Sequence, residues 1–500
     1  MRKARTAEVN KKYNIATIAI CVAFALAIIW QGAFFPMQFL PLLMISFITF
    51  AFIKKPLLIT LNVVLLFALV VVMFVSLLLL AQEPQIGIRE WLRYLLIPLS
   101  LLFFTTTKDK SDWYMRAFYA GIFAVAIFGL MALAGGIVIP FGVIEHSGRL
   151  QSTVQYANVT ALFMLIGILY SVEYFNKTKK WCYPIYAAGF AYCLYLTGSR
   201  TTFVLFFLIA VVFVLTKVSL KPRLAALGLL TLMFAGLIAF GGRIVQISLT
   251  EPTLIERVIT WQDGLRIALY YPWFGLGIGN WQFMQFFYQS APYGVRYIHN
   301  FYVQLLVDGG FLAAIIFIAI ICNALWRGLK GKNIHFFVVL AIAIHSFFDF
   351  SMTFGGVILI LAFSMAQIPD LTVRAIDAEA KPLSSTTNRL RFMVLIPAIA
   401  LLIMWVFESN YTVPDPLGNR LTESRQLYAD GEYMLAIERK EELLSLWRFN
   451  PHYQTLYFEL LTSAVNRGVI SLEEKKLRIH EAEQNREHIN PLYLRYIRRN

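Results

Sequence analysis

Long apolar runs alternate with short polar segments along most of the chain. Each run holds about 16–25 residues, and a helix of about 20 apolar residues spans the hydrocarbon core of a bilayer. The pattern therefore predicts an all-α polytopic membrane protein with about thirteen transmembrane helices. The predicted spans cover 14–30, 34–53, 57–81, 90–105, 113–134, 156–175, 181–197, 201–216, 223–241, 300–325, 334–350, 353–369 and 392–407.

The composition excludes an ordinary soluble protein. Hydrophobic residues make up 59% of the chain, against roughly 45–50% in soluble domains. The formal net charge is +15, but the basic residues lie in short loops between apolar runs, where they orient membrane helices. We therefore expect no nucleic-acid partner. The four cysteines lie in or at the ends of apolar runs without metal-ligand spacing, which favours packing roles.

Lysines in alternate loops predict the orientation of the spans. The N-terminus is basic, and lysines such as Lys54 and Lys55 recur in every second short loop, which places the N-terminus and these loops in the cytoplasm. Alternating sides from there places four segments outside: 135–156, 197–200, 242–299 and everything after 405. The polar stretch 370–391 is then a cytoplasmic linker before the last span.

A change in composition divides the chain into a membrane domain (1–409) and a C-terminal tail (410–500) that is rich in charged residues and helix formers. The aromatic and small residues of the tail are spaced as in a tetratricopeptide helix pair, at Tyr428, Gly431, Tyr433 and Ala436. About three such units are normally needed to bury a core. A plain helical cap on the outer face therefore stays open as the alternative to a tetratricopeptide-like tail.

The longest outer segment, 242–299, carries a predicted helix and a glycine turn. Thr253 and Glu256 fit a capping box, which marks a helix start. Apolar residues recur at helical spacing after it and predict a helix that lies along the membrane surface, at Leu254, Val258, Trp261, Leu265 and Ala268. Gly275 to Gly279 follows no strand and opens no βαβ unit, so we interpret it as a turn and not as a dinucleotide site.

Four arginines on the predicted outer face are candidates for anion binding or for structural roles. Arg266 has Asp263 three residues before it, so a local ion pair is expected. Arg257 points to the other side of the helix and has no acid three or four residues away, so its planar guanidinium is well placed to bind phosphate. Arg200 is a second candidate, with membrane anchoring as its alternative role. Arg149 is a weaker one, because an acid lies close to it in sequence.

His299 is the candidate general base of the outer face. It lies between Tyr297 and Asn300, where the chain re-enters the membrane, and imidazole can accept a proton from an attacking hydroxyl near neutral pH. A structural role is the alternative. His345 and Asp349, four residues apart in one predicted span, are expected to pair with each other. No acidic pair with metal-ligand spacing is predicted outside, so we expect neither a metal nor another cofactor.

Four stretches occur in order along the chain: Arg149 to Ala161, Gly198 to Thr201, Arg257 to Gly279, and His299 to Gly310. Together they resemble the O-antigen ligase and Wzy-type polymerase family of bacterial envelope glycosyltransferases. The resemblance covers roughly 85–370, and the last two stretches are its specific part.

The resemblance implies a metal-independent reaction at the outer face of the bacterial cytoplasmic membrane, with the C-terminus also outside. A glycan would be transferred or polymerised from an undecaprenyl-diphosphate carrier onto an acceptor hydroxyl. The residues that it implicates are His299 and Arg257 in catalysis, Arg200, Arg257 and Arg149 in diphosphate binding, and Asn300, Trp261 and Asp308 in support.

The acceptor and two other classes of function stay open. The acceptor could be a glycan, a lipid, a protein or a wall component, because ligases, polymerases and protein glycosyltransferases of this kind share the motifs. A flippase or transporter of lipid-linked glycans would place charges near the bilayer midplane. A non-catalytic scaffold would recruit partners through the tail and leave His299 and Arg257 dispensable.

Overall fold

The computed structural model of the 500-residue chain describes most of the membrane domain and the helical part of the tail. The described residues are 17–52, 57–82, 84–135, 143–144, 148–219, 222–224, 226–228, 230–231, 252–291, 293–331, 333–376, 395–408, 416–446 and 451–484. The predicted span 223–241 lies mostly outside them.

Helices make up nearly all of the described membrane domain, which confirms the helical fold class. In chain order they are Thr17–Ile29, α2 (Pro36–Phe52), α3 (Leu61–Leu80), α4 (Pro84–Thr106), α5 (Ser111–Gly135), α6 (Ala157–Thr178), α7 (Cys182–Leu196), α8 (Arg200–Lys217), α10 (Pro252–Tyr270), α11 (Trp281–Tyr288), α12 (Phe301–Gly331), α13 (Ile334–Phe348), α14 (Gly355–Gln367) and α16 (Leu395–Glu408). Single 3₁₀ turns lie at η1 (Gln31–Ala33), η2 (Lys108–Lys110) and η4 (Ser351–Thr353).

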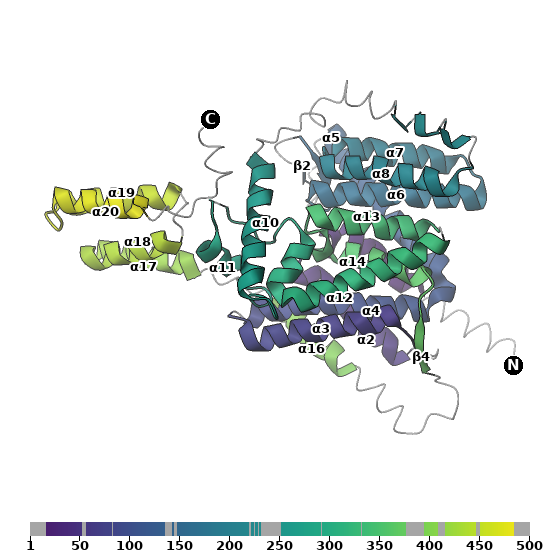
Figure 1. The fold of residues 1–500 in the computed structure, drawn as a ribbon, viewed down its shortest axis with the longest axis horizontal. Coiled ribbons are helices and arrows are strands. Elements are labelled where there is room, and N and C mark those ends of the chain that lie inside the picture. The colour runs from purple at the N-terminus through teal and green to yellow at the C-terminus, as the bar shows by residue number, and fades with distance from the viewer. Residues whose placement is uncertain are drawn as a thin grey trace.

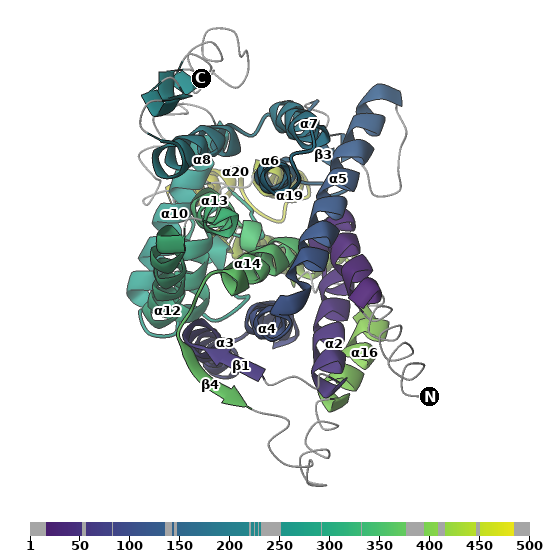
Figure 2. The same ribbon diagram turned by 90° about the vertical axis from the view of Figure 1, so that its right-hand side faces the viewer.

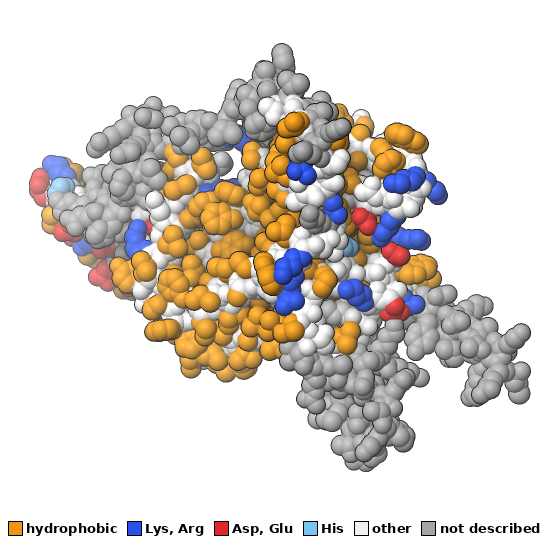
Figure 3. Space-filling model, turned by 45° about the vertical axis from the view of Figure 1, so that its right-hand side comes forward, with side chains coloured by type: hydrophobic (Ala, Val, Ile, Leu, Met, Phe, Trp, Pro, Cys, Tyr) orange, Lys and Arg blue, Asp and Glu red, His pale blue; other side chains and the backbone are white. Residues whose placement is uncertain are grey.

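Among the described helices, five are long and apolar enough to cross a membrane, and six shorter apolar helices accompany them. Large apolar side chains are exposed on the outside of the bundle, for example Val71 at 60%, Leu78 at 67% and Ile185 at 68%. Figure 3 shows such side chains covering a broad face, with lysines and arginines at one margin. A surface of this kind suits lipid, so the protein is a multi-pass membrane protein. The count of thirteen spans stays a prediction.

Helix α14 lies in the middle of the bundle, with α4 and α13 packed against it (Figure 2). Every residue from Gly355 to Ala366 is buried, and a helix that is apolar all round is expected at such a central position. It is only 13 residues long, which is short for a span. The 3₁₀ turn η4 joins it to the end of α13, and the residues around that turn form part of the candidate site.

Two short antiparallel strand pairs interrupt the helical pattern. The predicted span 57–81 begins with β1 (Leu57–Thr60), which pairs with β4 (Thr372–Ile376) from the predicted cytoplasmic linker. The prediction of a helix over 57–60 was therefore wrong. β-branched and leucine residues near a loop can form a strand when a partner strand is available, and that partner lies more than 300 residues away in the chain. The second pair joins β2 (Val143–Ile144) and β3 (Leu150–Ser152).

Helix α12 is broken near its start, and the glycine turn of the outer segment fills the break. Gly310 has φ +73° inside the helix. The Leu276 N–H donates to Val307 O at 2.7 Å, and the Phe311 N–H donates to Pro272 O at 2.8 Å. A Cβ atom on Gly275 would lie 2.3 Å from Val307 O, so only glycine fits this approach. The interpretation of Gly275 to Gly279 as a turn is confirmed.

Helix α10 runs across the ends of the bundle helices (Figure 1), but its buried face is not the predicted one. Ile259, Asp263 and Ile267 are fully buried, whereas Leu265 is 46% exposed. The reason is close packing on α12, because a Cβ atom on Gly264 would lie 2.7 Å from the Val303 side chain. Burial in α10 thus follows contact with α12 and the loop after α11 in place of a simple apolar stripe.

The tail folds into four helices: α17 (Pro416–Ala429), α18 (Tyr433–Leu446), α19 (Pro451–Asn466) and α20 (Leu472–Gln484). A left-handed Gly431, with φ +85°, connects the first two, and Ala436, Tyr457 and Leu461 form part of a small separate core. Figure 1 shows these helices apart from the bundle, on the side where α10 and α11 lie. The tetratricopeptide assignment stays a prediction.

Candidate functional site

Asp349 is the focus of the candidate site, at the end of α13. Its carboxylate is 2% exposed. The Tyr156 hydroxyl donates to both carboxylate oxygens at 2.9 Å, and the Asn158 amide donates to Oδ2 at 2.6 Å. Two neutral donors thus hold a buried carboxylate in place, as burial of a charge requires.

Two charged or basic side chains approach the same carboxylate from the outer segment. His299 Nδ1 lies 3.8 Å from Asp349 Oδ1, and Arg257 Nη2 lies 3.8 Å from Asp349 Oδ2. Both separations exceed a hydrogen bond, and both side chains are about one-fifth exposed. We refer to Asp349 with Tyr156, Asn158, Arg257 and His299 as the Asp349 cluster.

The direction of the His299 ring decides which nitrogen faces substrate. Its Nδ1 is buried and has no hydrogen-bond partner among the described residues, and it is the nitrogen nearest Asp349. A neutral imidazole with its proton on Nδ1 carries its lone pair on Nε2. The carboxylate therefore favours the tautomer in which Nε2 can accept a proton.

Arg257 has a partner that the sequence prediction lacked. The prediction rested on the absence of an acid within four residues on α10, which is correct locally, but Asp349 approaches from 92 positions later in the chain. The Arg257 Nη1 also donates to Phe348 O at 3.0 Å. The guanidinium is therefore oriented by α13, and its remaining N–H groups are directed elsewhere.

Arg149 joins the same network from the other side. Its Nη2 donates to the Asn158 side chain at 3.0 Å, and its Nε donates to Thr197 O at 2.8 Å. It packs over Gly198, with 3.6 Å between Nε and the position of a Cβ atom on that glycine. Arg200 begins α8 two residues later. The structure thus brings Arg149 and the Gly198 turn against the Asp349 cluster, through Asn158.

Trp261 and Asn300 hold the backbone on either side of the His299 side chain. The Trp261 indole N–H donates to His299 O at 3.0 Å. The Asn300 side chain accepts from the Tyr302 and Val303 N–H groups at 3.0 and 3.2 Å, which caps the start of α12. Asp308, the third predicted supporting residue, lies deeper in α12 and binds Tyr94 and Gln304 instead.

Asp263 anchors the loop after α11. The predicted pair with Arg266 is present at 3.0 Å, but Asp263 is fully buried and binds other groups as well. It accepts from the Ser290 N–H and hydroxyl at 2.8 and 2.7 Å and from the Tyr293 hydroxyl at 2.9 Å. Burial, together with the Asp263 carboxylate, raises the pKa of Tyr293, so the phenol stays a donor.

His345 does not pair with Asp349, and that prediction was wrong. Both ring nitrogens of His345 are buried without a hydrogen-bond partner among the described residues. Spacing of four residues would bring the two side chains together only if the helix continued, but α13 ends at Phe348 and Asp349 has extended backbone angles. Asp349 therefore turns to Tyr156 and Asn158.

Comparison with protein families bears on the same residues. A family model described as O-antigen ligase matches residues 185–318. The expected resemblance to the O-antigen ligase and Wzy-type polymerase family is confirmed. The matched region contains Arg200, Arg257 and His299, whereas Asn158 and Asp349 lie outside it on either side. No curated protein matches the chain.

The sequence prediction missed Asp349, Tyr156 and Phe350 as site residues. Tyr156 lay within a quoted stretch but was given no role, and Asp349 was assigned to His345. An acid at the outer end of an apolar run, without a basic residue in the preceding turn, was the available signal. Within the described part of the chain, no group of three His, Cys, Asp or Glu side chains is arranged to hold a metal ion.

Proposed function

We propose that this protein transfers a glycan from an undecaprenyl-diphosphate carrier to an acceptor hydroxyl at the outer face of the cytoplasmic membrane. The observation that carries the proposal is the approach of His299 and Arg257 to one buried carboxylate, each at 3.8 Å from Asp349. A base and a cation are thereby placed side by side, which are the two groups that displacement of a diphosphate requires.

In the proposed reaction, the acceptor oxygen attacks the anomeric carbon of the sugar as its proton moves to His299 Nε2. The bond between that carbon and the diphosphate oxygen breaks, and its electron pair stays on the diphosphate. Arg257 stabilises the developing negative charge, with Arg200 and Arg149 as further contacts in the same region. The products are the new glycosidic bond, protonated His299 and undecaprenyl diphosphate.

Asp349 has an orienting role in this scheme. It faces Nδ1 of His299 and so keeps Nε2 available, and it stabilises the imidazolium that forms as the proton arrives. Hydrogen bonds at catalytic centres are often long without substrate and shorten in the reacting complex. The 3.8 Å separation between His299 and Asp349 is consistent with such a change.

The acceptor is selected elsewhere, and we propose that the tail contributes to it. Helices α17 to α20 lie on the same side of the bundle as α10 (Figure 1). A polymer, protein or wall acceptor has a surface large enough for such a domain to bind. Transfer onto a second carrier-linked glycan would make the enzyme a polymerase, and transfer onto a different molecule would make it a ligase.

The test uses the full-length protein in lipid nanodiscs with a purified undecaprenyl-diphosphate glycan and a mixture of candidate acceptors. Release of undecaprenyl diphosphate reports the reaction, whatever the acceptor. His299→Gln should lose activity by 10²–10⁴-fold, the usual contribution of a general base, because glutamine cannot accept the proton. Normal folding and donor binding in this variant are the control. Near-normal turnover by His299→Gln, or glycan movement across the bilayer without bond cleavage, would contradict the proposal.

A further inference from the structure

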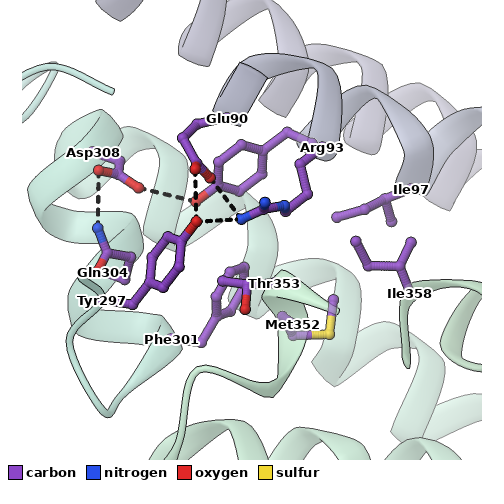
Figure 4. A pocket seen from close by; sticks show the side chains of 11 residues that line it. Glu90, Arg93, Ile97, Tyr297, Phe301, Gln304, Asp308, Met352, Thr353 and Ile358 are labelled. Atoms are coloured by element: carbon purple, nitrogen blue, oxygen red, sulfur yellow. Dashed lines mark hydrogen bonds and ion pairs between the residues drawn. The ribbon is translucent and has the colours of Figure 1, made fainter. Parts of the chain in front are cut away.

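A second polar cluster lies inside the bundle, next to the segment that carries His299. Glu90 and Arg93 are one helical turn apart on α4, and their side chains are 7% and 4% exposed. Arg93 Nη1 donates to Glu90 Oε2 at 2.8 Å and to the Tyr297 hydroxyl at 2.6 Å. The Tyr297 hydroxyl in turn donates to Glu90 Oε1 at 2.7 Å. Figure 4 shows this closed triangle, which we call the Glu90–Arg93 cluster.

The triangle needs an explanation other than stability. Removing two charges from water costs several kcal/mol for each ion, and apolar side chains of similar volume often serve a core equally well. Buried charged pairs can instead specify one arrangement of the groups around them. The question is therefore which arrangement the Glu90–Arg93 cluster specifies.

Tyr297 connects the cluster to the catalytic groups. Its ring stacks on Phe350 with 5.6 Å between centroids and 30° between planes. Phe350 directly follows Asp349, and its ring contacts His299 at 5.0 Å between centroids. One hydrogen-bonded phenol thus holds a ring that lies against both the proposed base and the residue next to the carboxylate that orients it.

The next two residues are also fixed, by different elements. The Ile298 N–H donates to Gln304 Oε1 at 2.9 Å, and Gln304 Nε2 donates to Asp308 at 3.0 Å within α12. The His299 carbonyl accepts from Trp261 of α10. The segment 297–299 is therefore held by α4, α12 and α10, and the α4 contact is the one made by charged side chains.

Arg93 extends the connection to a strained turn. Its Nη2 donates to Phe34 O at 3.0 Å, directly after η1, where Gln31, Gly32 and Ala33 have φ values of +50°, +62° and +55°. A residue with a side chain is disfavoured there by roughly 1–2 kcal/mol. Such strain persists where the surroundings impose it, and it is frequent at functional sites.

We propose that Glu90 and Arg93 are positioning residues for His299. Their pair fixes the Tyr297 phenol, Tyr297 fixes Phe350, and the two rings set the imidazole against Asp349. Neither charged residue touches substrate. The proposal rests on His299 being the base of the proposed transfer, but the positioning itself can be measured without that reaction.

The decisive variants are Tyr297→Phe, which removes only the hydroxyl in the triangle, and Arg93→Lys, which keeps the charge but not the fork. Tyr119→Phe is the matched control, because its hydroxyl lies 3.0 Å from Ser171 Oγ between α5 and α6, far from segment 297–299 in the chain. We expect kcat to fall on the order of 10–100-fold in Tyr297→Phe, as for a catalytic group displaced by a fraction of an ångström. The KM for the lipid-linked donor should stay within about twofold, since a positioning defect affects the chemical step and leaves ground-state binding intact.

Arg93→Lys should show a smaller loss of kcat than Arg93→Met, since lysine restores the charge beside Glu90. Tyr119→Phe should keep its kcat even where its melting temperature falls as much as that of Tyr297→Phe. Equal kcat values in Tyr297→Phe and the wild type would overturn the proposal, and so would kcat losses that simply follow melting temperature across all variants.

A second readout separates this proposal from the proposed function. The rate at which diethyl pyrocarbonate modifies His299, followed by mass spectrometry, reports the freedom of the imidazole whether or not transfer occurs. That rate should rise in Tyr297→Phe and stay unchanged in Tyr119→Phe. An inactive wild type with this difference intact would refute the transferase assignment alone, and an unchanged rate in Tyr297→Phe would refute the positioning role alone.

Discussion

The Asp349 cluster and the Glu90–Arg93 cluster use similar side chains in opposite ways. In the inner cluster the ionic contact is 2.8 Å long and both partners are nearly sealed from solvent. In the outer cluster both ionic contacts are 3.8 Å long, and His299 and Arg257 keep about one-fifth of their surface. The inner groups have satisfied one another, whereas the outer groups have been brought together with capacity left over.

The difference separates structural charge from charge available to a ligand. A cation with a short, buried partner has little left to offer an incoming anion. A cation held at 3.8 Å from a carboxylate by a backbone carbonyl can still bind phosphate strongly. Sequence cannot make this distinction, because Arg93 and Arg257 both lie in segments of mixed polarity and only the fold assigns their partners.

The largest expected effect tests the inner cluster. Arg93→Ala should lower the free energy of unfolding by about 3–5 kcal/mol, because it leaves Glu90 buried without its counter-ion. Arg257→Ala should lower it by less than about 1 kcal/mol, as for a partly exposed pair. Denaturant unfolding in detergent measures both values. Similar losses in the two variants would remove the distinction between the clusters.

Activity should show the reverse order for the outer arginine. We expect Arg257→Ala to reduce transfer by about 10²–10³-fold, the typical loss when one group that stabilises developing charge is removed. Arg266→Ala is the control on the same helix, since Arg266 is 43% exposed and pairs with Asp263. Turnover on the lipid-linked donor, at equal amounts of folded protein, measures the difference. Equal sensitivity of the two arginines would count against a role for Arg257 in binding diphosphate.

Asp349→Asn sharpens the comparison within the outer cluster. The substitution keeps the size of the side chain and can still accept from Tyr156, but it removes the charge that favours a proton on His299 Nδ1. Activity should fall on the order of 10²-fold, as for a misplaced or wrongly protonated catalytic group. Donor affinity should change little, which a binding measurement with the unreactive His299→Gln background can check. Loss of donor binding instead would assign Asp349 to the substrate site.

The smallest effect concerns alkaline pH and the inner cluster. Burial raises the pKa of Tyr297 to about 12, whereas an unfolded tyrosine titrates near 10. Unfolding therefore releases a proton between about pH 10 and 12, and stability that is complete below pH 10 is lost as the pH rises through this window. The contribution is about 1.4 kcal/mol for each pH unit. Tyr297→Phe should lack it, so the pH dependence of its unfolding free energy should be shallower than that of the wild type.

Much of the architecture could be predicted from local pattern alone. Apolar runs gave nearly all of the described helices within a few residues, because a membrane forces each run to satisfy its own backbone hydrogen bonds. The helix at 90–105 was predicted too short: α4 begins at Pro84, since its first turns are polar and lie against other protein. Where a run met a partner strand, as at Leu57–Thr60, the local pattern was insufficient.

The candidate site was predictable one residue at a time, but its connections were not. His299 and Arg257 were identified from residue type and position. Asp349 was not, because its partners Tyr156 and Asn158 precede it by more than 190 positions, and nothing in local spacing reports such a contact. The burial of Asp263 was missed for the same reason, since Ser290 and Tyr293 follow it by 27 and 30 positions.

The break in α12 has a consequence for the order in which the chain folds. The amide of Phe311 depends on Pro272 for its hydrogen bond, and the Ser76 hydroxyl on α3 lies 2.6 Å from Asp308 O and 3.1 Å from Phe274 O. The start of α12 cannot mature by itself, because its last partners arrive from an outer segment and from an earlier helix. Segment 272–276 must dock after α3 and α12 have met, as a late, separate step. Hydrogen exchange at Leu276 and Phe311 should therefore occur together, through undocking of that segment, and faster than exchange in the middle of α12.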